Sequence, residues 1–539
     1  MSGPFAALSA VPNACLLAWG GRRRLYAVVA GVVAALSLPP VDLSVLLLLA
    51  IPGLVWLLDG ALSDSDLTRR QRMLRGFSVG WFFGFGYFLA GLWWVGSAFL
   101  VDGDRYAWLM PFAVTAMPVG LALFHGAALA LAALFWTPGG SRILVLAITL
   151  SLSDWLRGHV LTGFPWNSFG YGVAGSLELS QTASLVGLYG LGLLVLLIAA
   201  APALLTGELK TRWRGFGAAT LLLVAMGVFG LWRLHAVEEP GLSDLDVRIV
   251  QPAIPQDEKW VPENRDRVFS SYLDLSSRPL GEGARVGAER LIIWPESAVP
   301  FLLTRTPTAL VAISALLHGE NQLATGAIRL EQGETPEASR YYNSLYLFDP
   351  DGEISGAYDK LHLVPFGEYL PLSEIFEALG ISRLVQGPGV FEPGFARMPL
   401  TLRSGKTLLP LICYEAIFPN ELAMEGGRPD LILNVTNDAW FGHTAGPYQH
   451  LAQARLRAIE QGLPLVRAAN TGISAVVDAK GRFVTRLELG ERAVADAAVP
   501  KALQGTVYTR LGSIIYAILL ILLAILASYY RYNPYSRKN

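Results

Sequence analysis

Long apolar runs are the feature that most restricts how this chain can fold. A helix needs roughly 17–25 mostly apolar residues to cross the hydrocarbon core of a bilayer. Runs of about this length recur along the chain: 23–40, 41–60, 76–100, 107–136, 141–160, 180–205, 214–234 and 510–530. With 53% hydrophobic and only 16% charged residues, the chain is too apolar for an ordinary soluble protein. The sequence therefore predicts a multi-span α-helical membrane domain with about eight transmembrane helices.

The run at 141–160 is the weakest of these, because Asp154 and Arg157 fall near its end. Charges at membrane depth often mark a functional site, but these two side chains could equally pair with each other near the interface. The loop that follows contains Gly163–Trp166. It is interpreted either as an aromatic anchor at the interface or as a lipid-facing rim near an active site.

Positive charge alternates between the loops that join the apolar runs. Arg22–Arg24 stand at the start of the first run, Arg69–Arg75 separate the second and third, and Lys210–Arg214 lie between the sixth and the body of the seventh. By the positive-inside rule these basic loops are cytoplasmic. We therefore expect a membrane domain with seven spans at 1–235, an extramembrane domain at 245–500 on the far side, and a C-terminal transmembrane helix at 510–530.

The segment 245–500 has a different pattern, in which short β-rich runs alternate with helical ones. Strands are expected at Val247–Val250, Arg290–Trp294, Ala324–Arg329, Leu345–Phe348, Leu408–Ile412, Leu431–Val435, Val466–Ala468 and Ile473–Val477. Helices are expected at 262–278, 308–318 and 447–462. Asp349–Gly352 and Asp478–Gly481 are turn signals, so each should join two strands as a hairpin. This mixture predicts an α/β domain whose sheet is buried by helices.

Three side chains in this domain have the chemistry of a catalytic set. Cys413 follows the buried run 407–412, and Glu296 follows Leu291–Trp294, so both should stand where a strand ends. A carboxylate against apolar walls can act as a general base, and a thiolate attacks acyl carbonyls. Lys360, in a largely apolar segment, could stabilise a developing oxyanion, and Glu368 could orient it.

Each of these residues also has a purely structural interpretation. Cys413 could be a small buried hydrophobe, Glu296 a cap or turn carboxylate, Lys360 a solvated lysine, and Glu368 a loop carboxylate. The set is more persuasive than its members, since three such groups at strand ends of one domain are unexpected by chance.

Several function classes find no support in the sequence. The net charge of -1, without a basic stripe, argues against nucleic-acid binding. No metal-ligand pattern and no Gly-rich phosphate loop is present, so no cofactor is expected; the nearest histidines, His443 and His450, are interpreted as ordinary hydrogen-bonding residues. Cys15 and Cys413 differ too much in context to form a disulfide framework. No heptad repeat or interface patch indicates an oligomer, so we expect a monomer.

Three motifs resemble those around the Glu-Lys-Cys triad of the nitrilase (carbon–nitrogen hydrolase) superfamily. They are WPES around Glu296, YDKLHLVPFGEYLP around Lys360 and LICYEAIFP around Cys413. The seven-plus-one spans, GFPW at 163–166, QPAIPQDEKW at 251–260 and NVTNDAWFG at 434–442 resemble the bacterial apolipoprotein N-acyltransferases. The resemblance covers nearly the whole chain. It implies a periplasmic α-β-β-α sandwich carried on inner-membrane spans.

The resemblance also implies an activity and a set of residue roles. A phospholipid would donate an acyl chain, through a thioester on Cys413, to the α-amino group of the S-diacylglyceryl cysteine that begins an apolipoprotein. Glu296 and Lys360 would complete the triad, and Glu368 would help position Lys360. Tyr414 and Glu415 would support the nucleophile, and Trp260 would contact acyl chains.

Two other functions remain open on the sequence alone. The first is a membrane-anchored amidase or nitrilase with water as the acceptor, although such an enzyme needs no eight spans. The second is a transporter or scaffold whose outer domain only binds lipoproteins, which would work normally without Cys413.

Overall fold

The structure is a computed structural model, and it describes residues 4–206, 209–237, 241–281, 283–335, 338–371, 390–422 and 427–532. The chain divides into two compact units. The first comprises Met1–Trp94, Pro111–Val237 and Thr506–Asn539, and the second comprises Val95–Met110 and Glu238–Gly505. We describe each unit by itself.

The first unit is entirely helical in its described parts. Its helices are α1 (Pro4–Leu16), α2 (Gly20–Ala35), α3 (Leu47–Ala61), α4 (Arg69–Leu92), α6 (Met110–Phe135), α7 (Ser141–Arg157), α8 (Leu177–Ser180), α9 (Ala183–Ala200), α10 (Leu209–His235), α16 (Val507–Leu511) and α17 (Ile514–Tyr532). Short 3-10 turns extend several of them.

Six helical stretches within the described ranges are long and apolar enough to cross a membrane. They are Ser44–Ala61, Arg69–Leu100, Gly103–Phe135, Ala183–Thr206, Arg212–His235 and Ile514–Arg531. These match six of the eight runs expected from the sequence. The other two runs also form helices, but α2 and α7 have only 16 and 17 residues.

Small residues allow the helices of this unit to pack closely. On α4, Gly76 and Gly80 face α6, and a Cβ atom at these positions would lie 2.4 Å from the carbonyl oxygen of Leu129 and 2.3 Å from that of His125. Any side chain would therefore push the two backbones apart. Such small-residue contacts are the usual way in which helices associate in lipid, where burying apolar surface gives little drive.

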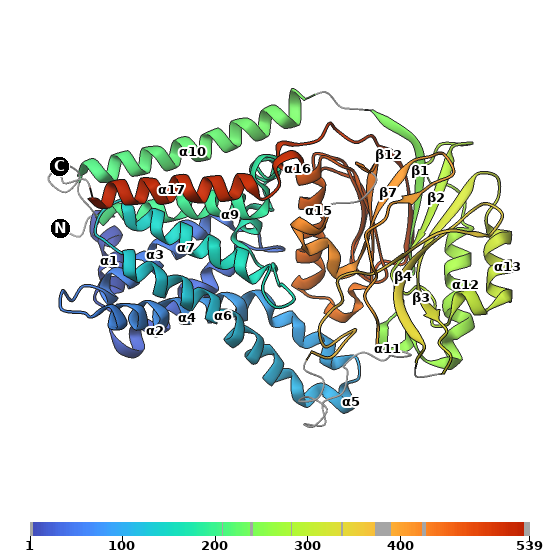
Figure 1. Ribbon diagram of the computed structural model, residues 1–539, viewed down its shortest axis with the longest axis horizontal. Helices are drawn as coiled ribbons and strands as arrows, with labels where there is room; N and C mark the ends of the chain where they lie inside the picture. The colour runs from blue at the N-terminus through green and yellow to red at the C-terminus, as the bar shows by residue number, and fades with distance from the viewer. Residues whose placement is uncertain are drawn as a thin grey trace. The chain divides into compact units, whose positions relative to one another are not determined.

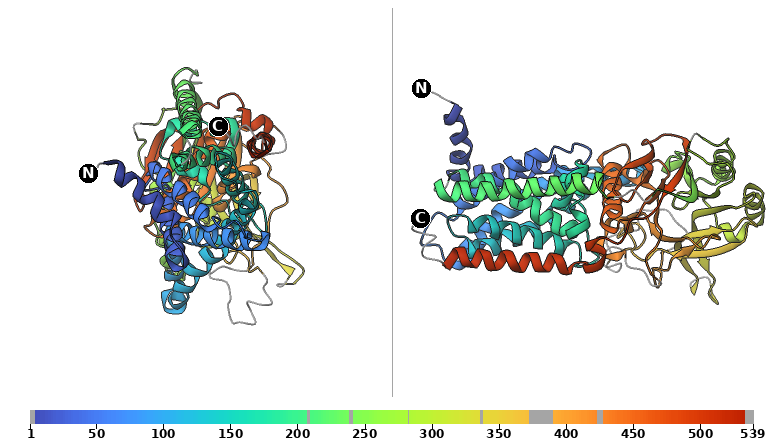
Figure 2. Two further views of the ribbon diagram at one scale, coloured as in Figure 1. Left: turned by 90° about the vertical axis from the view of Figure 1, so that its left-hand side faces the viewer. Right: turned by 90° about the horizontal axis from the view of Figure 1, so that it is seen from above.

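The helices α10 and α17 expose most of their apolar side chains. Leu221 and Val228 on α10, and Ile521 and Ile525 on α17, are all exposed. Figures 1 and 2 show these two helices extending along a common direction. A regular helix that stays apolar on an uncovered face is typical of a helix that contacts lipid.

The two charges near the end of α7 pair with each other. Arg157 Nη2 lies 2.8 Å from Asp154 Oδ1, and both side chains are buried. Arg157 also donates to the backbone oxygens of Phe164 and Trp166, so the pair holds the loop after α7. Trp166 is itself buried, which fits neither interpretation of this tryptophan, the aromatic anchor at the interface or the lipid-facing rim.

The second unit is built on two six-stranded sheets. The first has the order β12-β1-β2-β3-β4-β5 and the second β11-β10-β9-β8-β7-β6. The strands are β1 (Leu242–Gln251), β2 (Glu289–Trp294), β3 (Asn321–Glu331), β4 (Arg340–Phe348), β5 (Ile354–Asp359), β6 (Leu400–Thr401), β7 (Thr407–Ile412), β8 (Leu431–Thr436), β9 (Leu465–Ala469), β10 (Ser474–Val477), β11 (Phe483–Leu487) and β12 (Ala493–Pro500). In each sheet three neighbouring strands are parallel, β1-β2-β3 and β7-β8-β9, and the outer pairs are antiparallel.

Helices cover the outer face of each sheet. The first sheet is covered by α12 (Arg265–Ser276) and α13 (Pro307–Leu316), and the second by α15 (Ala445–Gln461). Figure 1 shows the resulting order of layers, with helices on both sides of paired sheets. The predicted α-β-β-α sandwich is therefore confirmed, and both predicted hairpins join antiparallel neighbours, β4 to β5 and β10 to β11.

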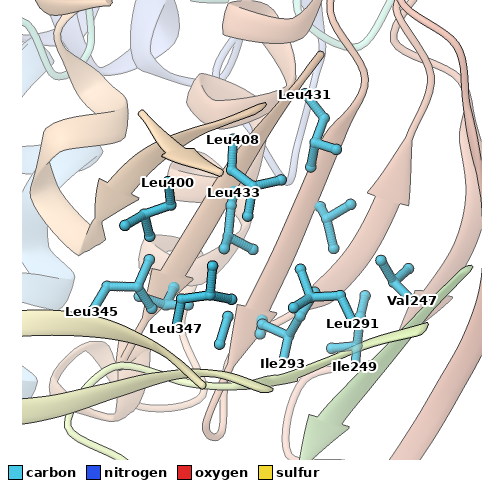
Figure 3. Close-up of a cluster of buried hydrophobic side chains, with 14 of the residues drawn as sticks. Val247, Ile249, Leu291, Ile293, Leu345, Leu347, Leu400, Leu408, Leu431 and Leu433 are labelled. Atoms are coloured by element: carbon cyan, nitrogen blue, oxygen red, sulfur yellow. The ribbon is translucent and has the colours of Figure 1, made fainter. Parts of the chain in front are cut away.

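Successive side chains along a strand point to opposite faces of the sheet, which explains how each sheet packs against the other sheet on one face and against helices on the other. In β2, Leu291 and Ile293 point into the core between the sheets, whereas Ile292 and Trp294 pack toward the helices. Figure 3 shows how leucines of both sheets, such as Leu345 and Leu433, fill the inner core. Burying one such side chain stabilises the fold by about 1.5–3 kcal/mol. This core fixes the strand ends on which the candidate site is built.

Candidate active site

Cys413 stands where the buried strand β7 ends. It opens a short 3-10 helix, Cys413–Ile417, and only 9% of its surface is exposed. Its φ angle is +51°, in the left-handed region that residues other than glycine seldom adopt. Such a conformation persists only where surrounding contacts hold it, and it is found most often at functional sites.

Glu296 stands at the end of β2, two residues beyond Trp294. Its Oε1 accepts a hydrogen bond from Asn343 Nδ2 at 2.8 Å, and its Oε2 accepts one from the Asn437 backbone N–H at 2.8 Å. Asn437 directly follows β8, so this carboxylate joins the ends of strands from both sheets. The turn also needs Gly326 on β3, because a Cβ there would lie 2.6 Å from the Cα of Glu296.

Lys360 is almost fully buried, at 1% exposure, just after β5. Its Nζ lies 2.9 Å from Glu368 Oε2 and 3.5 Å from Glu296 Oε1. Burial by itself lowers the pKa of Lys360, but the charges of Glu368 and Glu296 and a hydrogen bond with Glu368 raise that pKa above its ordinary value. The ammonium group is therefore charged at neutral pH. The three expected residues Glu296, Lys360 and Glu368 lie together.

The Cys413 thiol responds to the charges of the same groups. Burial raises its pKa, the Glu296 charge raises it further, and Lys360 and a hydrogen bond with Thr436 lower it only in part. The thiol is therefore protonated in this arrangement. Among the carboxylates whose charges raise this pKa, Glu296 acts most strongly.

Asn343 is a member of the cluster that the sequence analysis missed. From β4, its Nδ2 donates to Glu296 Oε1 at 2.8 Å and to Glu368 Oε1 at 2.7 Å. Its backbone oxygen also accepts from the Lys360 N–H at 2.9 Å. Among the described residues its Oδ1 is buried without a hydrogen-bond partner. Two adjacent polar residues, Asn343 and Ser344, between aromatic and aliphatic ones in this strand were the available signal.

Replacing Asn343 by aspartate should lower the rate of any reaction that uses Cys413 as its nucleophile by about 10²-fold, since a donor shared by two carboxylates becomes a third acceptor. The added negative charge also disfavours a thiolate at Cys413. Turnover at saturating substrate measures the effect. Asn264→Asp, which adds the same charge to a side chain that bonds the Glu258 backbone oxygen and the Arg267 side chain, should leave turnover unchanged. Equal effects of the two substitutions would contradict a specific role for Asn343.

Glu415 ties the strand of Cys413 to the segment of Lys360. Its Oε2 accepts from the Ile412 N–H at 2.7 Å, and its Oε1 accepts from the Leu361 N–H at 2.9 Å and from Tyr358 Oη at 2.6 Å. Arg397 Nη2 adds a salt bridge at 3.0 Å. Burial raises the pKa of Glu415, but Arg397 and these hydrogen bonds hold it below its ordinary value. A buried carboxylate thus fixes the spacing of two candidate residues.

The remaining expected residues border the cluster. Tyr414 is buried and packs edge-on against His362 and Phe418. Trp260 is half-buried and packs against an apolar cluster that contains Leu363.

Lys259, beside Trp260, was not anticipated. It is fully buried, and its Nζ donates to the backbone oxygen of Glu296 at 3.4 Å. Burial lowers the pKa of Lys259 to about 8, against the opposing charge of Glu296. A second cation thus supports the turn that carries Glu296.

Comparisons with known proteins agree with both units. The family model described as carbon-nitrogen hydrolase matches residues 246–508, and that described as apolipoprotein N-acyltransferase N-terminal domain matches residues 30–201. A solved amidase of the nitrilase superfamily from Nesterenkonia AN1 is 20% identical, with 52% of this chain and 99% of that chain covered and a TM-score of 0.35.

Two curated relatives are similar over nearly their full length. The apolipoprotein N-acyltransferase of Rhodopseudomonas palustris is 46% identical over 526 residues, which is 96% of this chain and 97% of that protein. The apolipoprotein N-acyltransferase of Agrobacterium fabrum is 46% identical over 484 residues, which is 90% of this chain and 91% of that protein. Since identity at this level extends across both units, the chain belongs to the apolipoprotein N-acyltransferase family.

Proposed function

We propose that this chain transfers an acyl chain from a phospholipid to the N-terminal amine of an S-diacylglyceryl-cysteine apolipoprotein, through a thioester on Cys413. The observation that carries the proposal is the buried cluster around Glu296, Lys360 and Glu368, whose charges act on a thiol at a strained strand end. Family membership supports the acceptor, because the relatives are named for it.

The first half-reaction acylates the enzyme. Glu296 takes the proton of the Cys413 thiol, and the sulfur attacks the carbonyl carbon of the phospholipid's sn-1 ester. Lys360 and a backbone N–H beyond Cys413 stabilise the oxyanion, each such donor contributing about 3–4 kcal/mol. When the C–O bond breaks, the proton on Glu296 passes to the departing lysophospholipid oxygen. The acyl chain is then held as a thioester.

The second half-reaction regenerates the thiol. The apolipoprotein amine attacks the thioester carbonyl and gives its proton to Glu296. The C–S bond breaks, an amide forms, and the proton on Glu296 returns to the sulfur. Because one product leaves before the second substrate reacts, the kinetics are ping-pong. No step requires a metal or a cofactor.

Both substrates are lipids, so the site must work beside a membrane. The alternating basic loops of the sequence support a bacterial inner-membrane location with the catalytic domain on the periplasmic side. In this arrangement the flanking helices α10 and α17 would tether the domain at both ends. We propose that Trp260, in its apolar cluster, contacts the acyl chains, and that the chain acts as a monomer.

Intact-protein mass spectrometry after incubation with a phospholipid alone tests the proposal. We expect a mass gain of one acyl chain that maps to Cys413 and is discharged by hydroxylamine. Addition of a diacylglyceryl lipopeptide should then remove the adduct and acylate the peptide. If no adduct forms and the enzyme instead releases ammonia from small amides, the chain is a hydrolase and the proposal fails.

A further inference from the structure

His450 on α15 is fully buried directly behind Cys413. Its Nε2 lies 3.1 Å from the backbone oxygen of Cys413. On its other side, Nδ1 lies 2.8 Å from Asp438 Oδ1 and 3.1 Å from Arg467 Nη2. The side chain therefore spans the distance between the candidate nucleophile's backbone and a buried ion pair.

The ion pair between Asp438 and Arg467 is held by several hydrogen bonds. Asp438 Oδ2 accepts from Arg467 Nη2 at 2.7 Å, and its Oδ1 also accepts from Thr436 Oγ1 at 2.9 Å. Arg467 additionally donates to Asn434 on the neighbouring strand β8. All of these side chains are buried. Thr436 further hydrogen-bonds the Cys413 thiol, so these hydrogen bonds reach the nucleophile through both its backbone and its sulfur.

The position of one proton on His450 follows from these partners. A carbonyl oxygen can only accept, so Nε2 must carry a proton in order to bond to Cys413. Nδ1 can then accept from Arg467 in a neutral ring or donate to Asp438 in a charged one. Burial lowers the pKa of His450, and Arg467 lowers it further. Both forms keep the bond to Cys413.

Holding the Cys413 carbonyl also fixes the next N–H group. The peptide unit is planar and trans, so the carbonyl of Cys413 and the N–H of Tyr414 point in opposite directions. A bond from His450 to this carbonyl therefore sets the direction of the Tyr414 N–H. A backbone N–H just beyond the nucleophile is the kind of donor that stabilises an oxyanion, and its contribution depends on accurate aim.

We propose that His450 is a positioning residue for acyl transfer: its Nε2–H holds the left-handed turn at Cys413 and thereby aims the backbone N–H that meets the oxyanion. This role rests on the proposed function, since it presupposes Cys413 as the nucleophile. His450 is fully buried, and its bond to Cys413 goes to the backbone oxygen. It should affect the rate of the chemical step and not the binding of phospholipid.

Two substitutions of His450 distinguish the contribution of Nε2 from that of Nδ1. Glutamine at 450 can place an N–H near the former Nε2, whereas asparagine is shorter and can only replace Nδ1. The rate of thioester formation on the full chain, measured by rapid-quench mass spectrometry at saturating phosphatidylethanolamine, should fall about 10²-fold in His450→Asn. In His450→Gln it should stay within about 10-fold of the unsubstituted chain. The half-saturating lipid concentration should change in neither.

Gln453→Met is the matched control. Gln453 is buried one turn further along α15, and its Oε1 has no partner among the described residues, so this change should leave the rate unaltered. An unaltered rate in His450→Asn, or an equal loss in both His450 variants, overturns the proposal. If His450→Asn does not fold, Asp438→Asn decides: a rate at least about 10-fold lower with unchanged lipid half-saturation supports the proposal, and an unchanged rate overturns it.

The proposed function fails in a different way. If the unsubstituted chain forms no thioester at Cys413, acyl transfer through this residue is refuted whatever His450 does. If the thioester forms normally and only the His450 comparison fails, the positioning role alone is refuted.

Discussion

Replacing Cys413 by alanine should abolish acyl-enzyme formation and lower acyl transfer by at least about 10³-fold. The proposed route has no other nucleophile, and a thioester cannot form without the sulfur. The fold should survive, because the change removes a single atom from a side chain that lies at the edge of the inner core. Labelled-phospholipid incubation and a thermal melt of the same preparation measure the two effects.

The chain provides its own control for this experiment. Cys15, in α1, is the only other cysteine, and Cys15→Ala should leave both the adduct and the transfer rate unchanged. Cys413→Ser should retain the shape of the site but acylate far more slowly, since a hydroxyl loses its proton much less readily than a thiol. A labelled adduct that persists in Cys413→Ala would refute the assignment. Normal transfer without Cys413 would mean that another group carries the chemistry, whereas normal function in the cell with no acyl transfer by either chain would favour a protein that only binds lipoproteins.

The strands that the sequence predicted are those buried on both faces. The runs in β2, β7 and β8 are continuous and apolar because one face packs between the sheets and the other under helices. Four strands were missed, and each is an outermost strand of its sheet. β5 and β11 have several exposed residues, β12 is rich in alanine, and β6 has only two residues, so none carries a strong apolar signal.

The sequence was sufficient to locate the ends of the predicted strands. It was not sufficient to tell which strand ends lie close together in the folded domain. Cys413 and Glu296 were recognised at the ends of predicted strands, and local sequence is sufficient for that, whereas Lys360 follows β5, which was not predicted. Asn343 and Glu415 act through partners that are 47 and 57 residues away in the sequence, and only the folded sheets bring these pairs together. His450 is similar, since its bond to Cys413 bridges 37 residues. The sequence analysis interpreted His450 as an ordinary hydrogen-bonding residue, but it did not identify the backbone oxygen of Cys413 as its partner.

Replacing Glu415 by glutamine should lower the free energy of unfolding of the catalytic unit by about 3–5 kcal/mol. The carboxylate accepts hydrogen bonds from two backbone segments and a tyrosine, and it is the closest countercharge of buried Arg397. Glutamine keeps one acceptor oxygen, but its amide NH₂ group replaces the other oxygen. This NH₂ group would then face N–H or O–H groups that are themselves donors. Among the described residues, Arg397 then keeps only Glu421, 4.0 Å away, as a salt-bridge partner. Acyl transfer should fall as well, because β7 and the Lys360 segment lose their common anchor.

The effect should depend on pH in a defined direction. The pKa of Glu415 is held below its ordinary value, so its stabilisation is fully present above the unfolded value of about 4.3. It is lost as the pH falls through the lower pKa of the folded state. The difference in stability between the unsubstituted chain and Glu415→Gln should therefore be constant from about pH 5 to 8 and shrink below about pH 4.

Hydrogen–deuterium exchange of peptides that cover β7 and residues 358–364 measures this difference locally, which suits a chain with two units better than one global melt. Glu421→Gln is the matched control, since Glu421 contacts His362 and Arg397 but is half-exposed. Its removal should cost no more than about 1 kcal/mol. A loss in Glu415→Gln as small as in Glu421→Gln would mean that Glu415 is not the anchor between the strand of Cys413 and Lys360. A loss that persists undiminished below pH 4 would instead assign the stabilisation to the shape of the side chain and not to its charge.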